Sequence, residues 1–119
     1  MACRRGGAGL CVPIRSAGTV PDTLRLEEEV RLRNVRQLTF GGENAEAYFS
    51  PDGTQLVFQS TRAPFACDQI FRMPVNGGDP VQVSTGSGRT TCAYFLADGA
   101  SILYASTHLG DAAFPPRPD

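Results

Sequence analysis

Apolar and polar residues follow short alternating runs through the middle of the chain, and one such run occurs twice. Residues 47–61 read AYFSPDGTQLVFQST, and residues 93–107 read AYFLADGASILYAST. Seven of these fifteen positions are identical, and Leu56/Ile102, Val57/Leu103 and Phe58/Tyr104 stay apolar. The offset is 46 residues, and residues 37–39 align with residues 82–84 at an offset of 45. The chain therefore contains an internal repeat.

The pattern predicts a strand for each run and a turn for each interruption. Strands are expected over residues 45–50, 55–60, 68–74 and 80–84, and again over 91–96 and 101–106. The turns depend on residue types that preset φ, bond to their own backbone or accept positive φ. These turn residues are Pro51, Asp52, Gly53, Asn76, Gly77, Gly78, Asp98 and Gly99.

A repeat of about 40–50 residues with several strands per unit is typical of a β-propeller. Residues 45–84 make one full four-stranded blade, and residues 91–106 make half of another. Upstream, Val30 and Leu32 alternate with Arg31 and Arg33, which predicts a preceding outer strand that extends to Leu38. The predicted fold class is all-β: a propeller fragment of about one and a half antiparallel blades.

Three regions follow from this division. Residues 1–29 are expected to form an irregular tail, residues 30–107 the propeller repeats, and residues 108–119 a Pro-rich C-terminal loop. Propellers usually close with about 4–8 blades. We therefore expect this chain to be a fragment of a longer protein, or a truncated product without a function of its own, and its first partners to be the missing blades.

The repeat resembles that of TolB-like propellers, which reads roughly xxfSPDGxxIaF, then a strand ending in Gly-Gly, then xxLT. Residues 47–58 carry the first part, and residues 36–39, 70–78 and 81–84 match the flanking parts. In the second copy Leu96 and Ala97 replace Ser-Pro. The resemblance implies a non-catalytic, periplasmic module that recognises partner proteins. The same repeat also forms the gating propeller of prolyl-oligopeptidase-like serine peptidases, which is the alternative.

Composition adds limits to these expectations. The net charge is −1, so no general attraction to nucleic acid or anionic lipid is expected. No run approaches the roughly 20 apolar residues of a spanning helix, so no membrane insertion is expected. Arg4-Arg5 followed by residues 6–12 is too glycine-rich for an ordinary export signal. The extracytoplasmic location is therefore implied by the family resemblance alone.

Four cysteines, Cys3, Cys11, Cys67 and Cys92, form no Cys-x-x-Cys pair, so a zinc site is not expected. Cys67 and Cys92 each end a loop that enters a strand, and the two loops open on the same side of a propeller. A disulfide between neighbouring blades is one interpretation, and two buried thiols that fill space are the other.

The remaining candidates favour structural roles. His108 lies near Asp111 after the last strand, but Ser87 in Gly86-Ser87-Gly88 lacks the elbow that a catalytic serine needs. Asp52 and Asp98 each have a turn to stabilise, so they are not expected to act as an acid–base pair. No catalytic residue, cofactor or metal is predicted. One further possibility is a face that meets an acidic partner through Arg62, Arg72 and Arg89.

Overall fold

The computed structural model describes residues 24–111 and 113, which divide into two compact units between Arg36 and Gln37. In the described part of the first unit the chain makes local turns: the carbonyl of Leu26 accepts the N–H of Glu29, and the carbonyl of Glu29 accepts that of Leu32, both at 3.1 Å. The outer strand predicted from Val30 to Leu38 is therefore wrong. Alternation alone does not make a strand when the backbone bonds locally and pairs with no neighbouring strand.

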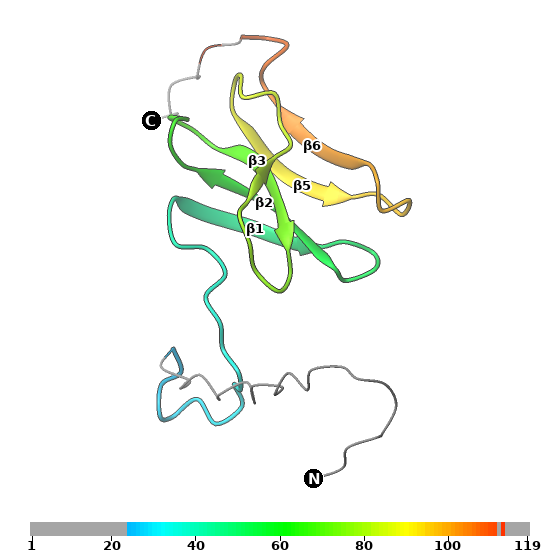
Figure 1. Ribbon diagram of the computed structural model, residues 1–119. Coiled ribbons are helices and arrows are strands. Elements are labelled where there is room, and N and C mark those ends of the chain that lie inside the picture. Colours follow the sequence, from blue (N-terminus) through cyan, green and yellow to red (C-terminus); the bar gives the residue numbers. More distant parts are fainter. Residues whose placement is uncertain (1–23, 112, 114–119) are drawn as a thin grey trace, which may run out of the picture. The chain divides into compact units, whose positions relative to one another are not determined.

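The second unit holds six strands. They are β1 (Glu43–Phe49), β2 (Gln55–Thr61), β3 (Gln69–Pro74), β4 (Val81–Gln82), β5 (Thr90–Phe95) and β6 (Ile102–Ser106). The first four form an antiparallel sheet in the order β1-β2-β3-β4, and β5 and β6 form a second antiparallel sheet. Figure 1 shows the β5–β6 pair beside the four-stranded sheet. Within the described residues no helix is long and apolar enough to cross a membrane.

The predictions for all six strands agree with these bounds to within two residues at each end. The short strand β4 covers two residues instead of the five predicted over 80–84. The coarse expectation of an all-β chain with antiparallel strands is thus confirmed. The closed propeller stays a prediction.

The repeat extends from the sequence into the strand register. Tyr48 pairs with Val57 in the first hairpin, and Tyr94 pairs with Leu103 in the second, each at the same offset of 46 residues. Both hairpins shift register at the same place, where two residues of one strand oppose one residue of the other. Such a shift is a β-bulge, which bends a strand and changes the direction of its side chains. The two hairpins are therefore equivalent residue by residue.

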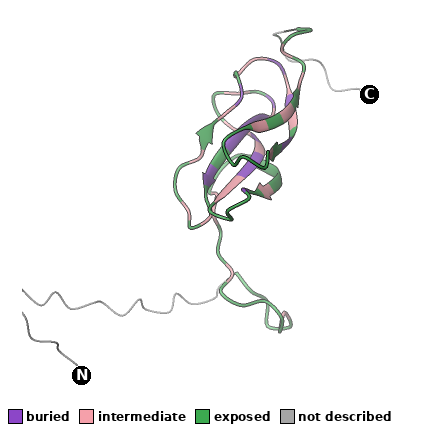
Figure 2. Ribbon diagram, turned by 90° about the vertical axis from the view of Figure 1, so that its right-hand side faces the viewer, coloured by how far each residue is buried: buried purple, intermediate pink, exposed green. Residues whose placement is uncertain are grey.

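The apolar core lies on both faces of the four-stranded sheet. One cluster contains Val57, Ile70 and Ala93, so it joins the two sheets. The other contains Phe58, Phe71 and Met73 on the opposite face. Figure 2 shows the buried residues gathered at the centre of this unit and exposed ones along its rim. Packing of one hairpin on the other therefore supplies one of the two cores.

Candidate interaction surfaces

The turn between β1 and β2 follows the predicted chemistry. The carbonyl of Ser50 accepts the N–H of Gly53 at 2.9 Å, with Pro51 and Asp52 between them. Gly53 has φ of 70°, and Gly99 in the equivalent turn has φ of 67°. Positive φ in this range favours glycine because it has no Cβ.

Each turn also holds one carboxylate. Asp52 accepts the hydroxyl of Ser50 at 2.6 Å and the N–H of Thr54 at 3.0 Å. Asp98 accepts the N–H of Ser101 at 2.9 Å and its hydroxyl at 2.7 Å. The hydroxyl of Ser50 lowers the pKa of Asp52, and the N–H of Ser101 lowers the pKa of Asp98. Each carboxylate thus stabilises its own turn.

The turn after β3 places positive φ on its two glycines. The carbonyl of Pro74 accepts the N–H of Gly77 at 3.1 Å, and Gly77 and Gly78 have φ of 102° and 134°. Asn76 does not have positive φ, so the expectation that it shares this task is wrong. The glycines supply the positive φ of this turn, and Val75 and Asn76 are the two central residues that the Pro74–Gly77 hydrogen bond encloses.

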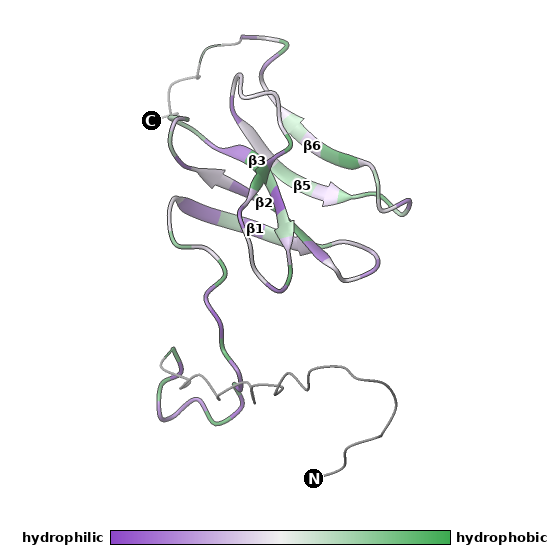
Figure 3. Cartoon of the chain, in the orientation of Figure 1, coloured by the Kyte–Doolittle hydropathy of each residue, from purple (hydrophilic) through white to green (hydrophobic). Residues whose placement is uncertain are grey.

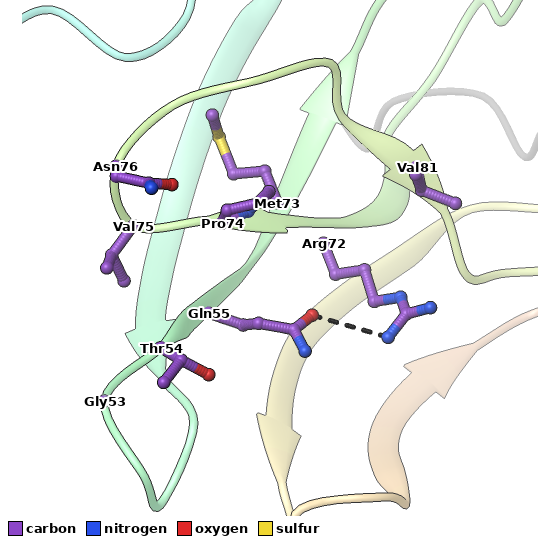
Figure 4. A pocket seen from close by; sticks show the side chains of 9 residues that line it. All are labelled: Gly53, Thr54, Gln55, Arg72, Met73, Pro74, Val75, Asn76 and Val81. Atoms are coloured by element: carbon purple, nitrogen blue, oxygen red, sulfur yellow. Dashed lines mark hydrogen bonds between the residues drawn. The ribbon is translucent and has the colours of Figure 1, made fainter. Parts of the chain in front are cut away.

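A cavity of about 630 Å³ lies between the ends of these two turns. Figure 4 shows its lining, in which Arg72 donates to Oε1 of Gln55 at 3.4 Å. The other lining residues are uncharged: Gly53, Thr54, Met73, Pro74, Val75, Asn76 and Val81. Because Arg72 is the one charged group of this lining, no acid–base pair or ligand cluster forms there.

The bulges carry an unusual backbone conformation at equivalent positions. Glu46 has φ of 54° and Cys92 has φ of 53°, and the two residues are 46 positions apart. Side chains other than glycine seldom adopt such values. In the first copy the carboxylate of Glu46 accepts the hydroxyl of Tyr48 at 2.8 Å. Hydrogen bonding with Tyr94 and Glu46 raises the pKa of Tyr48. Sequence analysis missed the bulges because Glu and Cys give no signal for them.

A buried polar network connects β3 with the loop before β5. Gln69 donates to the carbonyl of Gly88 at 2.8 Å and accepts the hydroxyl of Ser84 at 2.7 Å. The carbonyl of Asp68 accepts both the N–H and the hydroxyl of Thr90, each at 3.0 Å. The side chains of Gln69, Ser84 and Thr90 are buried. Satisfied buried polar groups specify one arrangement, so this network fixes how the two sheets pack.

The two cysteines do not form the disulfide that was one of the two interpretations of their placement. Cys67 is 1% exposed, and its thiol bonds to the carbonyl of Gly88 at 3.2 Å. Cys92 is exposed at the bulge, with its sulfur 3.3 Å from the hydroxyl of Thr91. Both are free thiols. The loops do meet, but the bulge leaves Cys92 at the surface while Cys67 is buried, and this burial raises the pKa of the Cys67 thiol.

A serine and the histidine form a close pair after β6. The hydroxyl of Ser106 lies 2.7 Å from Nδ1 of His108. In the first copy the equivalent residues are Ser60 and Arg62, and Nε of Arg62 donates to the hydroxyl of Ser60 at 3.0 Å. An arginine cannot act as a general base at neutral pH. In both copies the side chain two residues after the serine forms a hydrogen bond with its hydroxyl, so this contact is a feature of the repeat.

The other candidate groups are engaged separately. Asp111 accepts the N–H of Ala113 at 2.8 Å, and Ser87 donates its N–H to Thr85 at 3.3 Å. The guanidinium of Arg62 lies 4.9 Å from the ring centroid of Phe71. Arg72 lies at the cavity between the turns, and Arg89 lies 3.8 Å from the carboxylate of Asp68. These contacts link none of the three arginines to another.

The register places the apolar side chains of each sheet on two opposite faces. Cross-strand partners share a face, so the first sheet has a Val57 face and a Phe58 face. The Val57 face comprises Tyr48, Val57 and Ile70, and the Phe58 face comprises Ala47, Phe49, Leu56, Phe58, Phe71 and Met73. At equivalent positions the second sheet has a Leu103 face (Tyr94 and Leu103) and a Tyr104 face (Ala93, Phe95, Ile102 and Tyr104).

Two of these four faces cover each other, and the other two are open in part. Phe58, Phe71 and Met73 on the Phe58 face are buried, and the ring centroid of Tyr94 on the Leu103 face lies 4.3 Å from that of Tyr48. The Tyr104 face packs on the Val57 face in the shared cluster. On the Leu103 face, Leu103 is 63% exposed, whereas its equivalent Val57 is fully buried. On the Phe58 face, Phe49 is 68% exposed, whereas its equivalent Phe95 packs in the core. Figure 3 shows β6 as a strongly hydrophobic strand at the side of the unit. These two open faces are the candidate interaction surfaces.

Comparisons with known proteins identify no relative. No family model, no curated protein and no solved structure matches the chain.

Proposed function

We propose that this chain contributes one full blade and half of another to a β-propeller of the TolB-like kind. The propeller serves protein recognition outside the cytoplasm and is not catalytic. The observation that supports this proposal best is the face-to-face packing of two equivalent hairpins. A repeat unit of this kind buries each face against its neighbour, so its stability depends on adjoining units. The two open faces are then the places where further blades pack.

Site-specific photo-crosslinking in cells that make the protein tests this proposal. A photoreactive amino acid replaces Phe49 on the Phe58 face or Leu103 on the Leu103 face, and the crosslinked peptides are identified by mass spectrometry. We expect peptides that carry the same strand and Asp-Gly turn pattern, from this chain's own gene product or from another polypeptide. Leu109, which is 91% exposed in the loop after β6, is the control position. Equal crosslinking from all three positions contradicts the proposal.

The non-catalytic role has a separate test. A fluorophosphonate probe labels serines that a neighbouring base activates. We expect no labelling of Ser106 or Ser87 in the folded protein, because the Ser106–His108 contact repeats a structural contact of the first copy. Labelling of Ser106 that the His108→Arg variant loses assigns a nucleophile to this chain and overturns this part of the proposal.

A further inference from the structure

The interface inside the chain shows which face fits which. The Tyr104 face of the second hairpin is covered by the Val57 face of the first sheet. The Phe58 face resembles the Tyr104 face at equivalent positions: Ala47/Ala93 and Phe49/Phe95 are identical, and Leu56/Ile102 and Phe58/Tyr104 are similar in character. The Leu103 face repeats two of the three residues of the Val57 face, with Tyr94 in place of Tyr48 and Leu103 in place of Val57, and Ile70 has no equivalent in β5 or β6. At these two positions the Leu103 face therefore presents side chains of the kind that cover the Tyr104 face inside the chain.

The chain already covers the outer part of the Phe58 face in the expected way. Val83, which follows β4, packs against the cluster that contains Tyr104. Leu38, which aligns with Val83 at the offset of 45, packs against the cluster that contains Phe58. Each cluster thus receives one apolar residue from the segment that precedes a hairpin. The contacts that the Phe58 face still lacks are those made inside the chain by Tyr48, Val57 and Ile70.

A cavity marks the place of these absent contacts. It has a volume of about 220 Å³ and lies on the Phe58 face. Its lining includes Leu38, Ala47, Leu56, Phe58 and Met73. The equivalents of three lining residues (Ala93, Ile102 and Tyr104) are in the shared core. The cavity is therefore the unfilled counterpart of an interface that the same chain fills 46 residues later.

From this equivalence we propose that a second copy of this chain occupies the Phe58 face, with its Leu103 face against the cavity. The β5–β6 hairpin of one copy stands where the inner strands of a preceding blade belong, and residues 37–39 of the other copy lie beside it as the outer element. The net charge of −1 gives little repulsion between copies. Both faces are apolar, so their burial supplies the driving force.

The contact joins two different faces, so it is heterologous. A pair of copies still has one free face of each kind, the Leu103 face on one copy and the Phe58 face on the other. A heterologous contact forms a ring if its rotation closes and a chain of copies if it does not. This arrangement goes beyond the proposed propeller, because it assigns the neighbouring blade to another copy instead of to other polypeptide segments.

Two charge variants of the full chain test the pairing. Phe49→Asp damages the Phe58 face and leaves the Leu103 face intact, and Leu103→Asp does the reverse. Both side chains are more than half exposed, so the substitutions leave the core of one copy unchanged. Leu109→Asp is the matched control, since it changes an exposed apolar residue outside the strands. Molar mass is measured by sedimentation velocity and light scattering over a wide range of concentration, and circular dichroism confirms that each variant is folded.

We expect the original chain and Leu109→Asp to associate as concentration rises. Each face variant alone should associate roughly tenfold more weakly or not at all, because a carboxylate is costly to bury on an apolar face. An equimolar mixture of the two face variants should form a complex of two chains, since each supplies the intact face that the other lacks. If an aspartate variant is unfolded, Phe49→Gln and Leu103→Gln replace the pair.

Four results overturn the pairing. The first is an original chain that stays monomeric, and the second is that only one of the two face variants loses association while the other associates normally. The third is that neither variant weakens association, and the fourth is that the mixture of the two variants stays monomeric. The second result indicates a symmetric contact through one face, and the third indicates pairing through the open edges of the sheets. If the chain is monomeric in solution, the pairing of two copies is refuted but the propeller proposal is not. The crosslinking experiment in cells tests the propeller proposal separately, so failure of one proposal can be told from failure of the other.

Discussion

Gly88 is the position where one added methyl group should disturb the second hairpin most. A Cβ there would lie 2.7 Å from the backbone nitrogen of His108 and 2.8 Å from the hydroxyl of Thr107. The residue also has φ of 65°, a value that L side chains rarely adopt. Gly88→Ala therefore combines backbone strain with a collision against the chain that follows β6.

The magnitude follows from a comparison with Gly99. Gly99 has φ of 67°, and a Cβ there would meet no atom within 4 Å. Gly99→Ala should thus cost the strain alone, about 1–2 kcal/mol. Gly88→Ala adds overpacking of about 1–3 kcal/mol, for a total of about 2–5 kcal/mol. Small domains have total stabilities of about 5–15 kcal/mol, so the Gly88 variant should lose a large part of its stability.

Urea unfolding followed by circular dichroism measures both variants. Gly42→Ala extends the test to the first copy, because Gly42 is the equivalent of Gly88 and a Cβ there would lie 2.8 Å from the hydroxyl of Ser60. We expect Gly42→Ala and Gly88→Ala to be similar and both to be clearly less stable than Gly99→Ala. If Gly88→Ala unfolds at the same urea concentration as Gly99→Ala, the close packing of the second hairpin is refuted.

Three further predictions concern the core, the turns and the thiols. Ile70→Ala should cost about 2–5 kcal/mol of unfolding free energy, because Ile70 is fully buried in the cluster between the sheets; an unchanged urea midpoint contradicts this. The pKa values of Asp52 and Asp98 are lowered in the folded protein, so both carboxylates stabilise it above pH of about 4. This stabilisation is lost as the pH falls through the folded pKa values. Urea midpoints that stay constant on acidification contradict this prediction. In pulse alkylation with peptide mapping, the exposed thiol of Cys92 should react before the buried thiol of Cys67, and resistance of both thiols in unreduced, unfolded protein indicates a disulfide after all.

The strands were predictable because local chemistry and tertiary packing agree in this unit. Apolar runs with turn residues such as Asp52 and Gly53 between them leave few alternatives to antiparallel hairpins. The same reasoning failed at Val30 and Leu32, where alternation occurs without a partner strand. A strand needs a second strand to satisfy its backbone hydrogen bonds. The fold of the whole unit decides whether such a partner is present, so the sequence of one segment does not show it.

The candidate interaction surfaces were harder to predict from the sequence than the strands. The repeat indicated that blades pack on each other, but the two faces depend on which way each side chain points after the bulge at Glu46 and Cys92. The sequence left a disulfide and two buried thiols open for the same reason, since neither interpretation places the side chain of Cys92 at the surface. One signal was available: Leu103 and Val57 are equivalent and apolar, so both were candidates for a buried face.

The central claim is that the Tyr104 face of the second hairpin packs on the Val57 face of the first sheet. Nuclear Overhauser effects between methyl groups in dilute, isotope-labelled protein test it most directly. The structure predicts contacts that link Val57 and Ile70 with Ala93 and Ile102, and none from Val57 or Ile70 to Leu103. Contacts from Val57 or Ile70 to Leu103, with none to Ile102, would show that the second hairpin packs through its other face.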